Sequence, residues 1–383
     1  WFILGYVGLI NSHLVLAVYF TAFAFIYLLL NIKKVFDKEN LLALITSSTL
    51  ILLLTATFTI PMLQHKSLNA YTVFKDNGMA NGGSVAGSTM GFKDFFIQKP
   101  CAAYSDITYY LNLLEFGLAV YAIVINKKIF VKDEQNNFFK FLFIATIICT
   151  FLMSKLCPWV IFPKTLLMIQ FAWRLEAILL LLLSILAGSV FKTIENKKIR
   201  VTVVIITIAF NVFTVYNAYN FDILKDRKLE DIDMSSYGMG WQREYLPINT
   251  ENNLEYFDSR NDDILVKNGS ATISVKENNV PTLEAEIEDC ENETTIELPR
   301  IYYLGYEATL EENGTTKKLE LYMNDKGFIE TKVNSNGILK LTYKGTLMMQ
   351  IANAISIITL IGIVAYVIIR YVLNGKIKCL VNK

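Results

Sequence analysis

The segment 154–176, SKLCPWVIFPKTLLMIQFAWRLE, concentrates the residue types that suit phosphate binding. Lys155, Lys164 and Arg174 stand among two tryptophans and two prolines, and Glu176 follows Arg174 by two positions. Cations at the edge of an apolar segment attract lipid phosphates, and a guanidinium holds a phosphate through two parallel hydrogen bonds. We therefore interpret the segment as a site for a lipid-linked phosphate, with Arg174 as the clamp and Glu176 as its orienting partner. The alternative is an aromatic belt with an arginine that reaches the membrane surface and a locally paired glutamate.

The same segment shows a helical recurrence of apolar residues. Leu166, Leu167, Ile169, Gln170 and Trp173 have roughly the spacing of one helix face. Tryptophans favour the boundary between lipid and water. A short helix lying along the membrane surface is therefore expected here.

Other ionisable residues fall in or beside apolar runs. Glu115 lies within the run 107–125, where a carboxylate is either functional or paired with a lysine or hydroxyl. His13 and His65 flank two other runs and could face one cavity, although a solvated position is the simpler interpretation. Asp94 and Asp106 are weak candidates for a base or metal ligand.

Several kinds of site lack their expected spacing. The glycine-rich stretch 81–88 has no P-loop lysine, which favours a lid or an ordinary loop. The five cysteines show no metal-binding or redox spacing, and two histidines without acidic or thiol companions make a poor metal site. No cofactor is identified from these patterns, and a divalent metal is left open. The cysteines are Cys101, Cys149, Cys157, Cys290 and Cys379.

The composition indicates a membrane protein. The 383 residues are 53% hydrophobic with a mean hydropathy of +0.39, and charged residues are 19%. Since a soluble domain carries about 25% charged residues, the apolar excess is expected in lipid-facing helices. The net charge of +1 gives no surplus of cations for a nucleic-acid partner.

Seven apolar runs are candidates for transmembrane helices, which need about 20 residues each. The run 141–153 reaches that length only with its flanks. The runs are 14–30, extended backwards through 1–10, then 41–63, 107–125, 141–153, 175–191, 201–216 and 347–371.

Lysine and arginine clusters predict the orientation. Threading seven helices through the bilayer places the clusters after the first, third, fifth and last helices on one side, which the positive-inside rule assigns to the cytoplasm. The outer loops are then 64–106 and 154–173. We expect a membrane bundle over 1–219, an extracytoplasmic domain over 220–346, and a last helix with a cytoplasmic tail over 347–383, in the plasma membrane of a bacterium.

Alternating residues predict strands in the extracytoplasmic domain. Residues 272–275, 283–287 and 319–322 have the period of two that marks half-buried strands. Turn residues at 324–327 and 334–337 separate further runs. Together they favour a small antiparallel β-sandwich.

Short segments spread along the chain resemble a known family. They are 14–63 ending in Ile60-Pro61-Met62, CPW at 157–159 with QFAWR at 170–174, GWQREYLP at 240–247, ELPRIYYLGY at 297–306 and YKGT at 343–346. In these segments the chain resembles the C-terminal half to two thirds of the bacterial multipass proteins known as YfhO-like, or 6-pyruvoyl-tetrahydropterin-synthase-related. Those proteins are similar to the GT-C glycosyltransferases. Ala172 stands where the family usually has proline before Trp-Arg.

The resemblance implies sugar transfer on the outer face of the membrane. The expected donor is a polyprenyl-phosphate sugar, and the acceptor is a cell-envelope polymer such as a teichoic acid, or a glycolipid. Trp173 and Arg174 correspond to the lipid-phosphate region. The acidic catalytic residue of GT-C enzymes lies in a first outer loop, which is expected upstream of Trp1, since the chain reads as the C-terminal part of a longer protein. A transporter or flippase for lipid-linked glycans, or an envelope scaffold, is the alternative.

Overall fold

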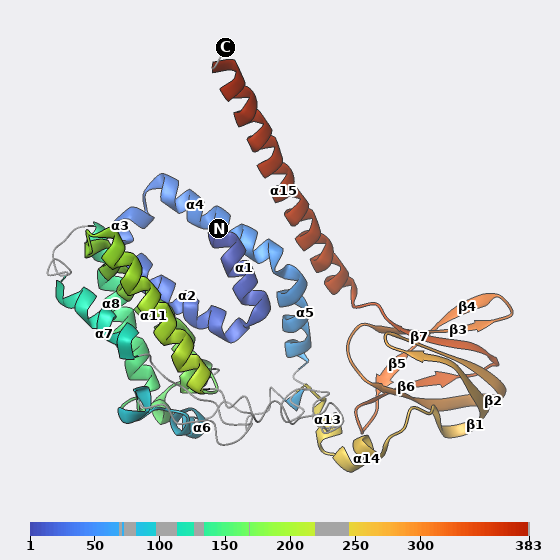
Figure 1. Ribbon diagram of the computed structural model, residues 1–383. Helices are drawn as coiled ribbons and strands as arrows, with labels where there is room; N and C mark the ends of the chain where they lie inside the picture. Colours follow the sequence, from blue (N-terminus) through green and yellow to red (C-terminus); the bar gives the residue numbers. More distant parts are fainter. Residues whose placement is uncertain are drawn as a thin grey trace. The chain divides into compact units, whose positions relative to one another are not determined.

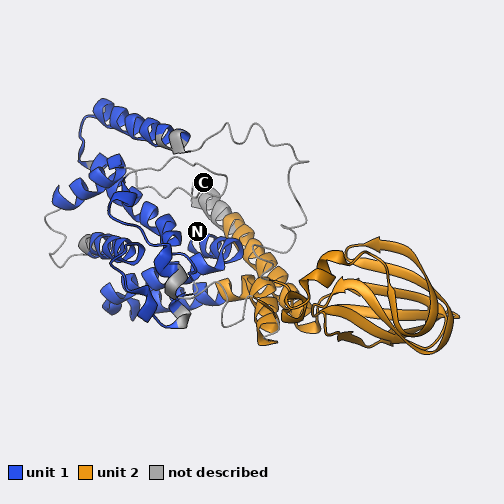
Figure 2. Ribbon diagram, turned by 90° about the horizontal axis from the view of Figure 1, so that it is seen from below, with its two compact units in different colours: residues 1–49, 79–232 blue, residues 50–78, 233–383 orange. Residues whose placement is uncertain are grey.

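The chain contains both helices and strands, with a helical N-terminal region and a C-terminal antiparallel sheet that curls toward a barrel (Figure 1). The computed structural model describes residues 1–68, 71–72, 82–96, 113–125, 134–167, 169–218 and 245–381. Asp106, Cys101 and most of the GWQREYLP segment lie outside these residues. Two compact units divide the chain: unit 1 is 1–49 with 79–232, and unit 2 is 50–78 with 233–383 (Figure 2).

Unit 1 is helical in the residues described. It is built from long helices and short helical turns. They are α1 (Phe2–Ser12), α2 (Leu14–Leu30), α3 (Ile32–Val35), the first part of α4 (Lys38–Leu54), α6 (Gly82–Gly87), η2 (Lys93–Phe95), α7 (Leu113–Ile125), α8 (Glu134–Met153), η4 (Trp159–Ile161), α9 (Lys164–Leu167), η5 (Ala172–Leu175), α10 (Glu176–Val190), η6 (Phe191–Thr193) and α11 (Lys197–Ala218).

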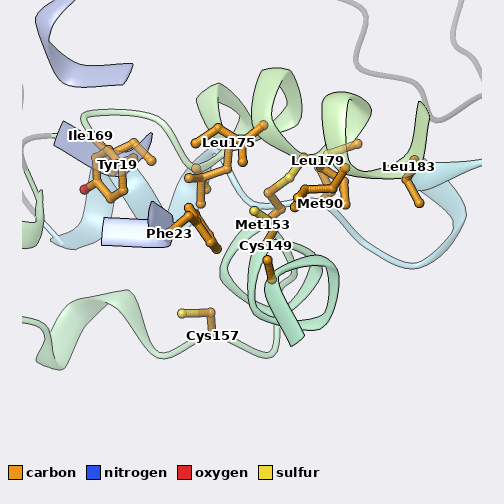
Figure 3. Packing of buried hydrophobic residues seen from close by; sticks show 14 of the residues in the cluster. Tyr19, Phe23, Met90, Cys149, Met153, Cys157, Ile169, Leu175, Leu179 and Leu183 are labelled. Atoms are coloured by element: carbon orange, nitrogen blue, oxygen red, sulfur yellow. The ribbon is translucent and has the colours of Figure 1, made fainter. Parts of the chain in front are cut away.

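The core of unit 1 forms around α10. Leu175, Leu179 and Leu183 are spaced four residues apart, so their side chains fall on one buried stripe (Figure 3). Met153 at the end of α8 packs into the same cluster, and so does Phe23 of α2. Burial of this stripe fixes which face of α10 points inward.

Two helical stretches are long and apolar enough to span a membrane, Ala172–Val190 and Leu347–Val372, and a third is available if α4 and α5 (Ala56–Ser67) form one bent span. Most other expected spans are apolar helices of 17 residues or fewer in the described chain. His13 ends one of them, because its extended backbone separates α1 from α2 and its Nδ1 accepts the Leu16 amide at 3.3 Å. Polar interruptions of this kind shorten the uninterrupted helices that the composition predicts.

Unit 2 combines α5 and α15 (Leu347–Val381) with the sheet and two short helices, α13 (Ile248–Glu251) and α14 (Leu254–Ser259). The expected continuous helix over 41–63 is wrong in one respect: the chain bends by 67° between α4 and α5. The hydroxyl of Ser356 in α15 donates to the Leu53 carbonyl at 2.9 Å and accepts the Thr57 amide at 3.0 Å. A straight helix would join those two groups directly. Ser356 is therefore inserted into the helical ladder at the bend.

The sheet contains seven antiparallel strands. Their order is β4-β3-β7-β2-β6-β5, and β1 pairs with β2. The predicted strands at 272–275 and 283–287 and both predicted turns are confirmed, since 324–327 joins β5 to β6 and 334–337 joins β6 to β7. The strand predicted over 319–322 is wrong as a single element, because the chain leaves the strand conformation at Glu320, between β4 and β5. The strands are β1 (Leu265–Asn279), β2 (Thr282–Ile301), β3 (Tyr306–Glu312), β4 (Thr315–Leu319), β5 (Leu321–Met323), β6 (Phe328–Val333) and β7 (Gly337–Tyr343).

One hydrogen-bonded sheet replaces the two separate sheets of the expected sandwich. The first half of β2 pairs with β7 over 282–287, and its second half pairs with β6 over 294–301. Between them, Asp289 and Asn292 have positive φ angles of 50° and 63°, which bend the strand. Because β2 serves both halves, the sheet curls around one core that includes Leu283, Ile296 and Leu341.

A buried carboxylate joins α14 to this sheet. Glu297 of β2 is fully buried and accepts hydrogen bonds from Tyr256 at 2.6 Å, Arg260 at 2.9 Å and Asn324 at 2.8 Å. Tyr256 and Arg260 donate to Oε1, whereas Asn324 donates to Oε2, and the ammonium of Lys267 lies 3.4 Å from Oε2. Burial alone would raise the pKa of Glu297, but these hydrogen bonds and cations outweigh it and hold the pKa below its ordinary value.

We predict that Ser356→Ala destabilises the contact of α5 with α15 by about 1–2 kcal/mol, because two backbone groups lose their bridging hydroxyl. Unfolding of the full chain by SDS in lipid bicelles measures the change. Thr359→Ala is the control, since the Thr359 hydroxyl bonds only to its own helix among the contacts described, at Ile355. Equal effects of the two substitutions would contradict the bridging role.

We predict that Glu297→Gln destabilises the sheet by about 3–5 kcal/mol, since it leaves Arg260 and Lys267 without their buried counter-charge. The stabilisation by Glu297 is complete above its ordinary pKa of 4.5 and is lost as the pH falls through its lowered value. The measurement is hydrogen exchange of β2 amides in the full chain at a series of pH values from 7 down to below the lowered pKa of Glu297, with the loss of protection expected at the acid end of the series. Glu293→Gln is the matched control, because Glu293 is exposed and pairs with Lys332 at the surface; an equal loss there would refute the prediction.

Candidate functional site

One end of unit 1 is closed by three segments that hydrogen-bond to one another. The Met90 amide donates to the Met153 carbonyl at 2.8 Å, and the Lys155 amide donates back to Met90 at 3.0 Å. The Ala172 amide donates to the Ser88 hydroxyl at 2.7 Å. The chain around 82–96 is thereby held between the end of α8 and the start of η5. This arrangement brings most of the sequence-predicted site residues to one end of the unit.

Arg174 is held in an aromatic clamp at this end. Its Nη1 donates to the Ile169 carbonyl at 3.1 Å and to the Gln170 side chain at 2.5 Å. Its guanidinium carbon lies 5.2 Å from the Phe171 ring centre and 5.9 Å from that of Trp173, and the two rings are stacked. Such contacts orient a guanidinium and keep its charge close to apolar surface.

The expected surface helix over 166–173 is wrong. Only the single turn α9 forms, followed after Gln170 by the 3-10 turn η5. Gln170 has a φ of 64°, which no α-helix accommodates. The turn points the Gln170 amide back at Arg174, so the break that ends the helix also positions the cation.

An apolar cavity of about 730 Å³ lies between α7 and α8 and reaches the same end of the unit. Aromatic and aliphatic side chains line most of it, and Lys155 is the charged residue in the lining. The polar groups at its rim come from Gly91, Ser154 and Lys155. Its inner walls are formed by Phe116, Ala119, Val120 and Ile123 of α7 and by Phe143, Thr146, Ile147 and Thr150 of α8.

Gly91 brings Lys155 close to Asp94. The Gly91 amide donates to Asp94 Oδ2 at 2.7 Å. A β-carbon on Gly91 would lie 3.0 Å from that oxygen and 3.9 Å from the Lys155 side chain. The Lys155 side chain and the fixed Asp94 carboxylate therefore both lie close to Gly91, which lines the apolar cavity together with Lys155.

The other predicted residues have more limited roles in the described structure. Glu115 is buried and accepts a hydrogen bond from Ser184 of α10, which supports the paired interpretation. Glu176 is half-buried at the first position of α10. His13 caps α2 in unit 1, whereas His65 belongs to unit 2, so a shared cavity stays a prediction. The side chain of Lys164 lies outside what the structure describes.

His65 sits in an aromatic cluster that was not predicted. Its Nδ1 lies 2.9 Å from the Tyr71 hydroxyl, and the Tyr71 ring stacks on Tyr303 at 5.7 Å. Burial raises the pKa of Tyr71 to about 12. The density of tyrosines at 302–306 was the sequence feature from which this cluster could have been predicted.

Two segments quoted for the family resemblance meet beside this cluster. The amides of Lys344 and Gly345 both donate to the Gly305 carbonyl, at 2.9 and 3.1 Å. Gly305 has a φ of 109°, and a β-carbon there would lie 2.6 Å from the α-carbon of Gly345. The ELPRIYYLGY and YKGT segments therefore meet in a close backbone crossing directly before α15.

Among the residues that the structure describes, no group of three histidine, cysteine or acidic side chains could hold a metal ion. No family model, curated protein or solved structure matches the chain.

We predict that Gly305→Ala destabilises unit 2 by about 2–4 kcal/mol, which combines backbone strain at positive φ with overpacking against Gly345. Gly314→Ala is the control for strain alone, because Gly314 has a φ of 76° and open space around it; about 1–2 kcal/mol is expected there. Thermal unfolding of the full chain gives both values. Equal losses would show that the crossing tolerates a side chain.

Proposed function

We propose that this protein is a GT-C-like membrane glycosyltransferase that uses a polyprenyl-phosphate sugar as donor. The observation that supports it best is the cavity of about 730 Å³ between α7 and α8, which is largely apolar and has Lys155 in its lining. An isoprenoid chain requires apolar surface, and its phosphate requires a cation where that surface meets water. The cavity and its rim offer both.

The chemistry assigns distinct tasks to the residues at this end. An acceptor hydroxyl attacks the anomeric carbon, the bond from that carbon to the phosphate oxygen breaks, and the polyprenyl phosphate leaves with the extra negative charge. Lys155 would stabilise that developing charge, and Arg174 would contact the phosphate or the sugar from its aromatic clamp, with Glu176 nearby in sequence. The base that accepts the hydroxyl proton would be the acidic residue that the resemblance to GT-C enzymes implies.

The proposed membrane arrangement follows the lysine clusters. Seven spans would place segment 154–173 and the sheet of unit 2 on the outer face of a bacterial plasma membrane, where the sheet would present the envelope acceptor. Within unit 1, α2 and α8 run in opposite directions. Asn137 near the start of α8 bonds to Asn31 after α2, whereas the Tyr19 hydroxyl early in α2 bonds to Leu166 beyond the end of α8. The lysines at 33, 34 and 38 and segment 154–173 therefore lie toward opposite ends of α8, as this topology requires.

A carrier without catalysis is the second candidate. The residues that line the cavity include no aspartate, glutamate or histidine, so the described cavity can hold a lipid chain without supplying a base. A flippase or a scaffold for lipid-linked glycans would need no more than that.

We predict that a photoreactive polyprenyl phosphate labels α7 and α8 of the full-length protein in proteoliposomes. Lys155→Ala is expected to weaken binding about tenfold, because one charge-assisted hydrogen bond to phosphate is lost. Lys93→Ala is the matched control, since Lys93 is exposed at the same end but does not line the cavity. Labelling elsewhere, or equal effects of the two substitutions, would refute the proposed site.

Transfer of radiolabelled sugar from the same carrier separates the two candidates. A glycosyltransferase is expected to lose turnover in Arg174→Ala and Lys155→Ala. Lipid binding that is retained without any transfer by the wild-type full-length protein would favour the carrier instead.

A further inference from the structure

A second groove of about 560 Å³ lies at the opposite end of unit 1, between α2 with α3 on one side and α4 on the other. Its character differs from that of the larger cavity. Tyr27, Leu28 and Leu44 provide apolar walls, and Asn31, Lys34 and Asn40 provide polar groups. A groove that is apolar along part of its lining and polar along the rest matches an amphiphile rather than a hydrocarbon or a water-soluble anion.

Side-chain hydrogen bonds hold the polar part of the groove in place. The Asn40 side chain donates to the Lys34 carbonyl at 2.9 Å, and the Asn137 side chain of α8 donates to the Leu30 carbonyl at 3.3 Å and to Asn31 at 3.1 Å. These amides satisfy carbonyls where the chain reverses between α2 and α4. Lys34 is therefore presented from a fixed turn.

The charges around the turn favour an anion at this position. Lys33, Lys34 and Lys38 are exposed there, and of these Lys34 lines the groove. The acidic residues of the turn, Asp37 and Glu39, are not among the lining residues. Asn40 also places the first turn of α4 at the groove, and the amino end of a helix carries partial positive charge.

Exposed apolar residues on the same turn suit a lipid surface. Phe36 is 70% exposed and Ile32 is 43% exposed, beside the lysines. Large apolar side chains alternating with cations are typical of segments that lie where acyl chains meet headgroups. In the membrane arrangement proposed above, this turn lies at the cytoplasmic surface, where phospholipids place their phosphates.

We propose that this groove binds one anionic glycerophospholipid of the surrounding membrane, with an acyl chain against Leu28 and Leu44 and the headgroup phosphate at Lys34. The site is separate from the proposed carrier site, which lies at the other end of α8. It would fix the turn between α2 and α4 in the bilayer surface.

Native mass spectrometry of the full-length protein, delipidated and then titrated with defined lipids, tests the assignment. Phosphatidylglycerol is expected to bind at least fivefold more tightly than phosphatidylcholine. Lys34→Ala should abolish that preference, and Lys34→Arg should retain it. Lys33→Ala is the matched control, because Lys33 is an exposed cation of the same turn that does not line the groove, and it should leave the preference unchanged.

Two further measurements fix the mode of binding. Glycerol phosphate at millimolar concentration should not displace the phospholipid, and Leu44→Trp, which fills the groove, should weaken binding. Equal losses in Lys33→Ala and Lys34→Ala would show diffuse attraction to the membrane and overturn the site. Full displacement by glycerol phosphate would overturn the acyl-chain contact. Labelling of α7 and α8 by the polyprenyl probe should be unaffected by Lys34→Ala, so the two proposals fail independently.

Discussion

Every peptide group that leaves water must find a hydrogen-bond partner, and this requirement shapes the helical part of the protein more than any single side chain. At three breaks in the described apolar helices, a polar side chain bonds to the interrupted backbone. His13 accepts the Leu16 amide in the first turn of α2, Asn137 donates to the Leu30 carbonyl at the end of that helix, and Ser356 bridges the Leu53 carbonyl and the Thr57 amide where α4 meets α5. These side chains bond to backbone groups that have lost their helical partner, so segments that would otherwise be continuous helices can bend or end there.

The same requirement concentrates polar chemistry at the two ends of unit 1. At one end, Lys155 and Asp94 flank Gly91 at the rim of the larger cavity, and Arg174 is held by Gln170 and two stacked rings. At the other end, Asn31, Lys34 and Asn40 surround a smaller groove. The helices between them pack through leucine and other apolar side chains. A lipid-like ligand suits either end, because each joins apolar walls to a cation where the helices stop.

In unit 2, the buried charge of Glu297 is balanced by groups from three directions. Tyr256 and Arg260 come from α14 and the residue after it, Lys267 from β1 and Asn324 from the turn before β6. An apolar residue at this position could pack against the same neighbours, but it would not require these particular polar partners. We interpret the network as a device that specifies where the 245–263 segment docks on the sheet, and the Gly305–Gly345 crossing as the corresponding constraint at the start of α15.

Composition and periodicity determined the mixed class of this protein, the antiparallel strands, both hairpin turns and the helical nature of the apolar runs, because these depend on local patterns of two or 3.6 residues. They also singled out Lys155 and Arg174 as candidates, since cations inside apolar segments are conspicuous. Tertiary structure alone decided the rest. The bend at Thr55 depends on Ser356, some 300 residues away in sequence, and the single curled sheet depends on β2 pairing with both β6 and β7. The cavity beside Lys155 likewise forms only because α7 and α8 both pack on α10, and contacts between segments distant in the chain leave no periodic trace in either one.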